Sequence, residues 1–162
     1  MTELIFRYVK IAIAFTLAWV LLYVWTSCSY REIKGKEMVK SGISPGKNYW
    51  IMIKERTPSQ LKEEDIVAFE YAIPGLGDKE AVRAGRIQAV PGQRVKLVKG
   101  ELFVNDRKVA TGVGKPEDNF DEVIVPRDSF FILMDDPQIG PNYDSRAIGP
   151  LGAGAVLGKV KK

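Results

Sequence analysis

The chain has 162 residues, of which 46% are apolar and 27% charged, with a formal net charge of +4. This length allows one domain with an appendage, and this composition is typical of a folded protein rather than a disordered one. The basic residues are interspersed with acidic ones, which excludes the concentrated basic surface of a nucleic-acid-binding protein. The absence of histidine excludes Ser-His-Asp and Cys-His catalysis and any histidine-containing zinc site. A hydrolase of this composition would need a lysine, an amino terminus or a carboxylate as its base.

Residues 11–30, IAIAFTLAWVLLYVWTSCSY, contain no charged residue. As a helix this stretch would be about 30 Å long, which matches the hydrocarbon core of a bilayer. Aromatic residues gather in its second half, as they do where a span meets the membrane interface. We therefore predict one uncleaved transmembrane helix, with residues 1–30 forming an N-terminal tail and anchor.

Basic residues flank this stretch on both sides, with Arg7 and Lys10 before it and Arg31 after it. The preceding pair favours a cytoplasmic N terminus, which would place the rest of the chain on the outer side of the cytoplasmic membrane. A cleaved signal peptide, a lipoprotein signal ending at Cys28 and a buried core helix are the alternatives. The cleavage sites of a signal peptide and of a lipoprotein signal both need small residues, and the bulky side chain of Trp25 argues against either site here. The single cysteine also excludes an internal disulfide.

Residues 31–162 contain short runs rich in valine, isoleucine, phenylalanine and tyrosine, bounded by glycine, proline, asparagine or aspartate. Such runs are typical of β-strands. The runs are 48–53, 65–71, 86–90, 94–98, 101–105, 108–111, 122–125, 129–134 and 155–160. Asn105-Asp106 predicts a hairpin turn, and residues 58–65 are the one stretch that favours a short helical turn. We expect a mostly antiparallel β domain, residues 31–162, on one N-terminal membrane helix.

Three segments of this domain carry motifs of one known family in the same order. Residues 132–160, ILMDDPQIGPNYDSRAIGPLGAGAVLGKV, resemble the pattern Gly-Asp-Asn, a spacer, and Ser-x-Asp-Ser-Arg-x-x-Gly-x-Val of the type I signal peptidases. Residues 85–109, GRIQAVPGQRVKLVKGELFVNDRKV, resemble Lys-Arg-Val-x-Gly-x-Pro-Gly-Asp-x-Val followed by a strand and Val-Asn-Gly. Residues 44–71, SPGKNYWIMIKERTPSQLKEEDIVAFEY, resemble the conjugative-transfer (TraF-type) branch, which reads Ser-x-Pro-x-Gly-x-Tyr and then Leu-Lys-x-Gly-Asp-x-Val-x-Phe. Together with the single N-terminal span, which the family also has, these segments extend the resemblance over nearly the whole chain in the right order.

The resemblance implies a signal-peptidase-like fold and a serine endopeptidase that uses a buried lysine as its general base. Desolvation lowers the pKa of such a lysine toward working pH, which suits a chain without histidine. The implied substrate is the leader peptide of an exported protein or a prepilin, cut at the outer face of the membrane. Components of a conjugative transfer apparatus are the implied partners. We expect no cofactor, no metal and no nucleic acid.

The positions that match the family's base and its support carry other residue types. Counting back from Pro91-Gly92 places the family's Lys-Arg pair at Gly85 and Arg86, so the lysine is replaced by glycine. The serine that supports this lysine in the family falls on Asn142. The resemblance therefore identifies no base in this chain.

The position that matches the nucleophile has also changed. The register of the conjugative-transfer pattern, counted from Pro45, places the nucleophile at Ile43, and the general Gly-x-Ser-Met pattern places it at Glu37. Ser44 and Ser41 flank the first of these positions, and a shift in the loop would bring either into place. Ser44 is the better candidate, because the pattern keeps its proline close after the serine.

Arg86, Asp144 and Arg146 match a charged cluster of the family. We expect Asp144 to lie between the two guanidinium groups as a structural clamp, since arginine grips a carboxylate with two hydrogen bonds.

Two functional hypotheses follow, and a plain assembly module on a membrane anchor is a third. The first is a pseudopeptidase that keeps the fold and binds leader peptides, pilin or transfer components without cutting them. The second is an active peptidase with Ser44 as nucleophile and a lysine from elsewhere as base. Lys79, Lys40 and Lys47 are the candidates, and glycine at position 85 would leave room for an incoming lysine.

Overall fold

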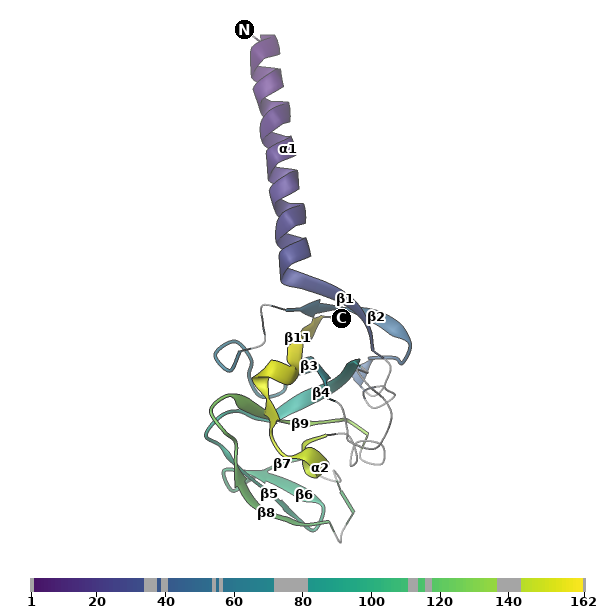
Figure 1. Ribbon diagram of the computed structural model, residues 1–162, viewed down its shortest axis with the longest axis vertical. Helices are drawn as coiled ribbons and strands as arrows, with labels where there is room; N and C mark the ends of the chain where they lie inside the picture. The colour runs from purple at the N-terminus through teal and green to yellow at the C-terminus, as the bar shows by residue number, and fades with distance from the viewer. Residues whose placement is uncertain are drawn as a thin grey trace.

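The computed structural model describes residues 2–33, 38, 41–53, 55, 57–71, 82–110, 114–115, 118–136 and 144–161. A long helix at the N terminus leads into a β domain (Figure 1). Three of the residues singled out above, Lys40, Lys79 and Asn142, lie outside the described residues, as does Glu37.

The helix α1 spans Thr2–Ser27, and its segment Ile5–Ser27 is long and apolar enough to cross a membrane. It ends three residues before the predicted end of the anchor, because the strand β1 (Cys28–Ile33) starts at once. β1 pairs antiparallel with β2 (Lys47–Met52), from Cys28 opposite Met52 to Ile33 opposite Lys47. Pairing with a distant strand therefore decides where the helix ends.

Two sheets form the β domain. The larger sheet has seven strands in the order β1-β2-β11-β3-β4-β9-β10, and the smaller sheet has four in the order β7-β6-β5-β8. The remaining strands of the larger sheet are β3 (Ile66–Glu70), β4 (Val82–Ala89), β9 (Ser129–Leu133), β10 (Leu151–Gly152) and β11 (Val156–Lys161). Those of the smaller sheet are β5 (Arg94–Val98), β6 (Glu101–Val104), β7 (Arg107–Ala110) and β8 (Phe120–Ile124). The pairings described are antiparallel, so the predicted fold class is confirmed.

The predicted hairpin turn is also confirmed. The stretch expected to favour a short helical turn, residues 58–65, forms turns and no regular helix. Asn105 and Asp106 have φ values of 48° and 63° and join β6 to β7, as a two-residue hairpin turn requires. Residues 58–65 form turns, with Leu61 N–H donating to Thr57 O at 3.1 Å. The short helix α2 (Ser145–Ile148) and a 3₁₀ turn at Ala153–Ala155 were not predicted.

The strand β9 joins two hydrophobic clusters, one for each sheet. Phe130 and Ile132 are buried in the cluster of the larger sheet, whereas Phe131 and Leu133 are buried in that of the smaller sheet. Neighbouring residues of a strand point to opposite faces, so one strand can serve both cores. Ile43 is also fully buried, which makes the aligned nucleophile position part of the core.

Candidate functional site

A partly exposed polar cluster surrounds Arg86 on β4. Arg86 pairs with Ile66 of β3 on one side and with Leu133 of β9 on the other. Glu64 and Asp135 each lie two residues beyond these pairing partners, which places them diagonally on the same face as Arg86. The strand register therefore brings two carboxylates to one guanidinium group.

The guanidinium group of Arg86 binds three separate segments. Its Nε lies 3.2 Å from Asp135 Oδ1, and its Nη1 donates to the carbonyl oxygen of Glu64 at 3.2 Å. Its Nη2 donates to the hydroxyl oxygen of Ser41 at 2.5 Å. Glu64 has a φ of 70°, so this contact also holds a residue in the left-handed region, which non-glycine residues rarely adopt. Arg86 thus links the Ser41 turn, the turn before β3 and the end of β9.

Ser41 lies at the centre of this cluster. Its hydroxyl donates to Asp135 Oδ2 while it accepts from Arg86. Two backbone hydrogen bonds hold the turn that carries it, because Ser41 N–H and Ile43 N–H both donate to Met38 O, at 3.0 and 3.2 Å. Met38 and Ile43 are buried in the core. We refer to Ser41, Glu64, Arg86 and Asp135 as the Ser41 cluster.

Ser44, the preferred nucleophile of the sequence analysis, has a different environment. Its backbone N–H donates to the Tyr49 hydroxyl at 2.7 Å, and that hydroxyl donates to Gly42 O at 3.5 Å. In the described part of the chain, no side-chain hydrogen bond involves the Ser44 hydroxyl, and no lysine is bonded to Ser44 or Ser41. Lys47 is exposed at the start of β2. The structure therefore brings Ser41, and not Ser44, to Arg86.

Core atoms lie close to Gly85, where the sequence analysis expected room for an incoming lysine. A Cβ atom at Gly85 would overlap Ile132 Cγ2 and would lie 3.1 Å from Phe69 Cε1 and 3.2 Å from Leu133 O. Gly85 precedes Arg86 on β4 and so faces the core, whereas Arg86 faces Ser41. The position that matches the family's base is thus filled by the side chain of Ile132.

Asp144 and Arg146 form a buried ion pair. Arg146 Nη2 lies 2.5 Å from Asp144 Oδ2, and Arg146 Nε lies 2.9 Å from Asp144 Oδ1. Asp144 also caps α2, since its side chain accepts from Arg146 N–H at 3.0 Å. The expected contact of Asp144 with Arg146 is present, but the expected contact with Arg86 is not, because Arg86 faces the Ser41 turn and pairs with Asp135 and Glu64 instead.

The segment that contains Asp144 and Ser145 also accepts hydrogen bonds from backbone N–H groups at one edge of β9. The two-residue strand β10 pairs with Ser129 and Phe130. Beyond it, Ile132 N–H donates to Ser145 Oγ at 2.9 Å and Met134 N–H donates to Asp144 Oδ2 at 3.1 Å. Alternate N–H groups of a strand point to one edge, so the two side chains continue the ladder where β10 ends. The role of Ser145 was not predicted, because it depends on the length of β10.

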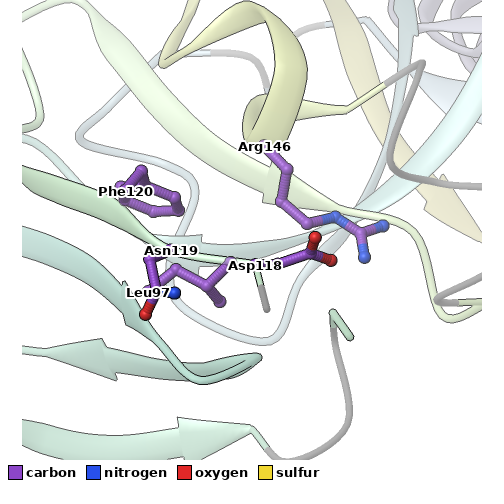
Figure 2. Close-up of a pocket in the computed structure, with 5 residues that line it drawn as sticks. All are labelled: Leu97, Asp118, Asn119, Phe120 and Arg146. Carbon is purple, nitrogen blue, oxygen red and sulfur yellow. The ribbon is translucent and has the colours of Figure 1, made fainter. Parts of the chain in front are cut away.

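A second feature is a small pocket of about 220 Å³ at the smaller sheet. Figure 2 shows its lining, which comes from β5, from the segment before β8 and the first residue of β8, and from α2: Leu97, Asp118, Asn119, Phe120 and Arg146. It shares no residue with the Ser41 cluster. Among the described residues, no group of three aspartate, glutamate or cysteine side chains lies close enough to hold a metal ion.

Comparisons with known proteins identify a family and several similar solved structures. Residues 5–162 match the family described as "Signal peptidase, peptidase S26". A crystal structure of a signal peptidase I from Enterococcus faecalis V583 is similar, with 19% sequence identity and a TM-score of 0.46. The match covers 62% of this chain and 97% of that chain. The comparison with curated proteins gives no match.

Proposed function

Because the chain belongs to the signal peptidase family, peptidase S26, we propose that it is a membrane-anchored pseudopeptidase of that family. It binds leader-bearing or pilin-type proteins without cutting them. α1 anchors it in the cytoplasmic membrane, and the β domain lies on the outer side. The resemblance of residues 44–71 to the conjugative-transfer branch supports components of a transfer apparatus as clients.

The state of Ser41 is the observation that carries this proposal. A serine attacks a carbonyl carbon with an oxygen lone pair while a base removes its proton. Here the guanidinium group of Arg86 donates to that oxygen at 2.5 Å, which draws electron density away from it. The hydroxyl is therefore held as part of an ion-pair network rather than poised for attack.

The surroundings of Gly85 support the same proposal. A lysine base needs burial to lower its pKa, and Gly85 supplies no amine. Ile132 fills the adjoining space, so an amine cannot enter along the matching path without displacing the core. Recognition of an extended peptide by strand addition uses backbone hydrogen bonds and needs neither group.

One contact favours a second candidate function, an active peptidase. The Ser41 hydroxyl donates to Asp135 Oδ2, and a general base must be within hydrogen-bond reach of the proton that it removes. In this mechanism Asp135 takes the proton as Ser41 Oγ bonds to the scissile carbonyl carbon. The proton passes to the leaving amine when the peptide bond breaks, and water then hydrolyses the acyl-enzyme.

The test combines binding and cleavage on the full chain in detergent. Fluorescent leader peptides and prepilin segments are titrated with the wild type, Ser41→Ala, Ser44→Ala and Asp135→Asn, while mass spectrometry follows the peptides. The proposal expects saturable binding by the wild type and by Ser44→Ala, with intact peptide throughout. Cleavage that Ser41→Ala and Asp135→Asn both abolish would establish the second candidate, and absence of binding would leave an assembly module.

A further inference from the structure

The small pocket between the smaller sheet and α2 has an apolar wall. Leu97 of β5 lies directly opposite Phe120 of β8, so the two side chains share one face of the sheet. Leu97 is 4% exposed, and Phe120 packs against the same hydrophobic cluster. The ring of Phe120 also contacts the ring of Phe131, with their centroids 5.8 Å apart. The core of the smaller sheet therefore holds this wall in place.

The polar part of the lining includes two charged side chains that face each other. Figure 2 shows the carboxylate group of Asp118 and the guanidinium group of Arg146 turned toward one another. In the part of the chain that the structure describes, the two groups are not bonded to each other. Arg146 is bound to Asp144 instead, through Nε at 2.9 Å and Nη2 at 2.5 Å.

Backbone hydrogen bonds hold the carboxylate group of Asp118. Lys115 N–H donates to Asp118 Oδ2 at 2.7 Å, and Asp118 N–H donates to Lys115 O at 2.9 Å. Asp118 O in turn accepts from Gly100 N–H at 3.0 Å. Among the described residues no donor binds Asp118 Oδ1, so one oxygen of a fixed carboxylate group can accept a hydrogen bond from a ligand.

The charges at the pocket favour a cation as that ligand. The charge of Arg146 is balanced by the fully buried side chain of Asp144. Asp118 is half-buried and has no ion-pair partner among the residues described, so one negative charge is left over. A positively charged donor placed there forms a charge-assisted hydrogen bond, which is shorter and stronger than a neutral one.

The size of the pocket limits the ligand to one side chain. Sites that bind a whole drug-sized molecule measure about 300–1,000 Å³. This pocket measures about 220 Å³. An alkyl chain against Leu97 and Phe120 with a cationic head at Asp118 matches its lining. A lysine side chain has both parts, because its stem is apolar and its end carries an ammonium group.

We propose that the pocket lined by Leu97, Phe120 and Asp118 binds an alkylammonium group, the chemistry that a lysine side chain of a bound protein presents. This inference rests on the proposed function only in taking that protein to be a client of the β domain. Binding at the pocket needs neither the Ser41 cluster nor cleavage. It selects clients by a basic residue, because an acidic side chain would meet the uncompensated charge of Asp118.

The test uses n-butylammonium, which has the chain and the head group of a lysine side chain and so requires no client. It is titrated into the isotope-labelled full chain in a non-ionic detergent, while NMR follows the backbone amides of Leu97, Asp118 and Phe120. n-Butanol and n-butyrate are the matched ligand controls, since one is uncharged and the other carries the opposite charge.

Two variants separate the pocket from the general charge of the protein. Asp118→Asn removes the charge and keeps a side-chain oxygen for Lys115 N–H. Asp121→Asn removes the same charge from an exposed residue of β8 that does not line the pocket.

We expect n-butylammonium to shift the three amides saturably in the wild type and in Asp121→Asn. It should bind Asp118→Asn about tenfold more weakly, because a hydrogen bond between charged groups is lost. n-Butanol should bind more weakly than n-butylammonium, and n-butyrate should leave the amides unshifted.

Three results would overturn the proposal: no saturable shift, equal affinity for n-butylammonium and n-butanol, or an equal loss of affinity in the two variants. If Asp118→Asn does not fold, the comparison of the three ligands on the wild type still decides. Failure of a leader-bearing protein to bind, with these results intact, would refute the proposed function and leave the pocket assigned.

Discussion

Asp144→Asn should destabilise the β domain strongly, although it changes one atom of a single side chain. The side chain of Asp144 is fully buried and that of Arg146 is 6% exposed, and two of their hydrogen bonds are 2.5 and 2.9 Å long. Removing one partner of a buried ion pair costs about 3–5 kcal/mol, because a charge is left without its counter-charge. Asparagine still offers one oxygen to Met134 N–H or to Arg146, so we expect the lower end of this range.

The assay is thermal unfolding of the full chain in detergent, followed by circular dichroism. A domain of this size loses about 2–4 °C of its thermal midpoint per kcal/mol, so a cost of about 3 kcal/mol lowers the midpoint by about 6–12 °C. The matched control is Asp106→Asn, which breaks an exposed pair with Lys96 of the same length, 2.5 Å. Exposed pairs contribute little to stability, so the control should unfold with the wild type. If Asp144→Asn and Asp106→Asn unfold at the same temperature, the buried pair does not stabilise the fold as described.

Three further predictions concern the core and an exposed pair. Gly85→Ala should destabilise the protein by about 1–3 kcal/mol in denaturant unfolding, because its Cβ overlaps Ile132. Adding Ile132→Leu to Gly85→Ala should recover part of the lost stability, because leucine has no Cγ2 branch at Cβ. If the stability losses of the two single variants simply add in the double variant, the Cβ of residue 85 does not overlap Ile132 as described. Ser145→Ala should cost about 1–3 kcal/mol by the same measurement, since the buried N–H of Ile132 loses its acceptor, and an unchanged stability would refute that role. The hydrogen bond from Lys96 and the charges of Lys96 and Arg94 hold the pKa of Asp106 below its usual value, so NMR titration should show a higher pKa in Lys96→Met. Because the pKa of Asp106 is lower in the folded than in the unfolded protein, its ionised carboxylate stabilises the fold at pH values above the unfolded-state pKa. This stabilisation is lost as the pH falls through the folded-state pKa.

The strands could be predicted from the sequence because their pattern is local. Each of the nine predicted runs became a strand, since alternating apolar residues bounded by turn residues specify extended backbone. β1 was missed, because Cys28–Tyr30 are uncharged and continue the apolar run of the helix. Only pairing with β2, a distant part of the chain, separates them from α1.

The site could be predicted in its residue types but not in its contacts. Arg86, Asp144 and Arg146 were identified as charged groups of one cluster, but the partner of Arg86 depends on strand register and on which face it occupies. Register places Asp135 beside it, 49 residues away in the sequence. The space at Gly85 likewise depends on Ile132, which lies on a neighbouring strand.

The most direct test of the proposed function is the fate of a bound precursor. The full chain in detergent is incubated at neutral and alkaline pH with a leader-bearing prepilin that it binds, and the precursor is then weighed by mass spectrometry. We predict a bound precursor of unchanged mass, because Arg86 engages the serine hydroxyl that the structure places at the Ser41 cluster. A shortened product that the wild type forms and Ser41→Ala does not form would contradict the pseudopeptidase and establish an enzyme.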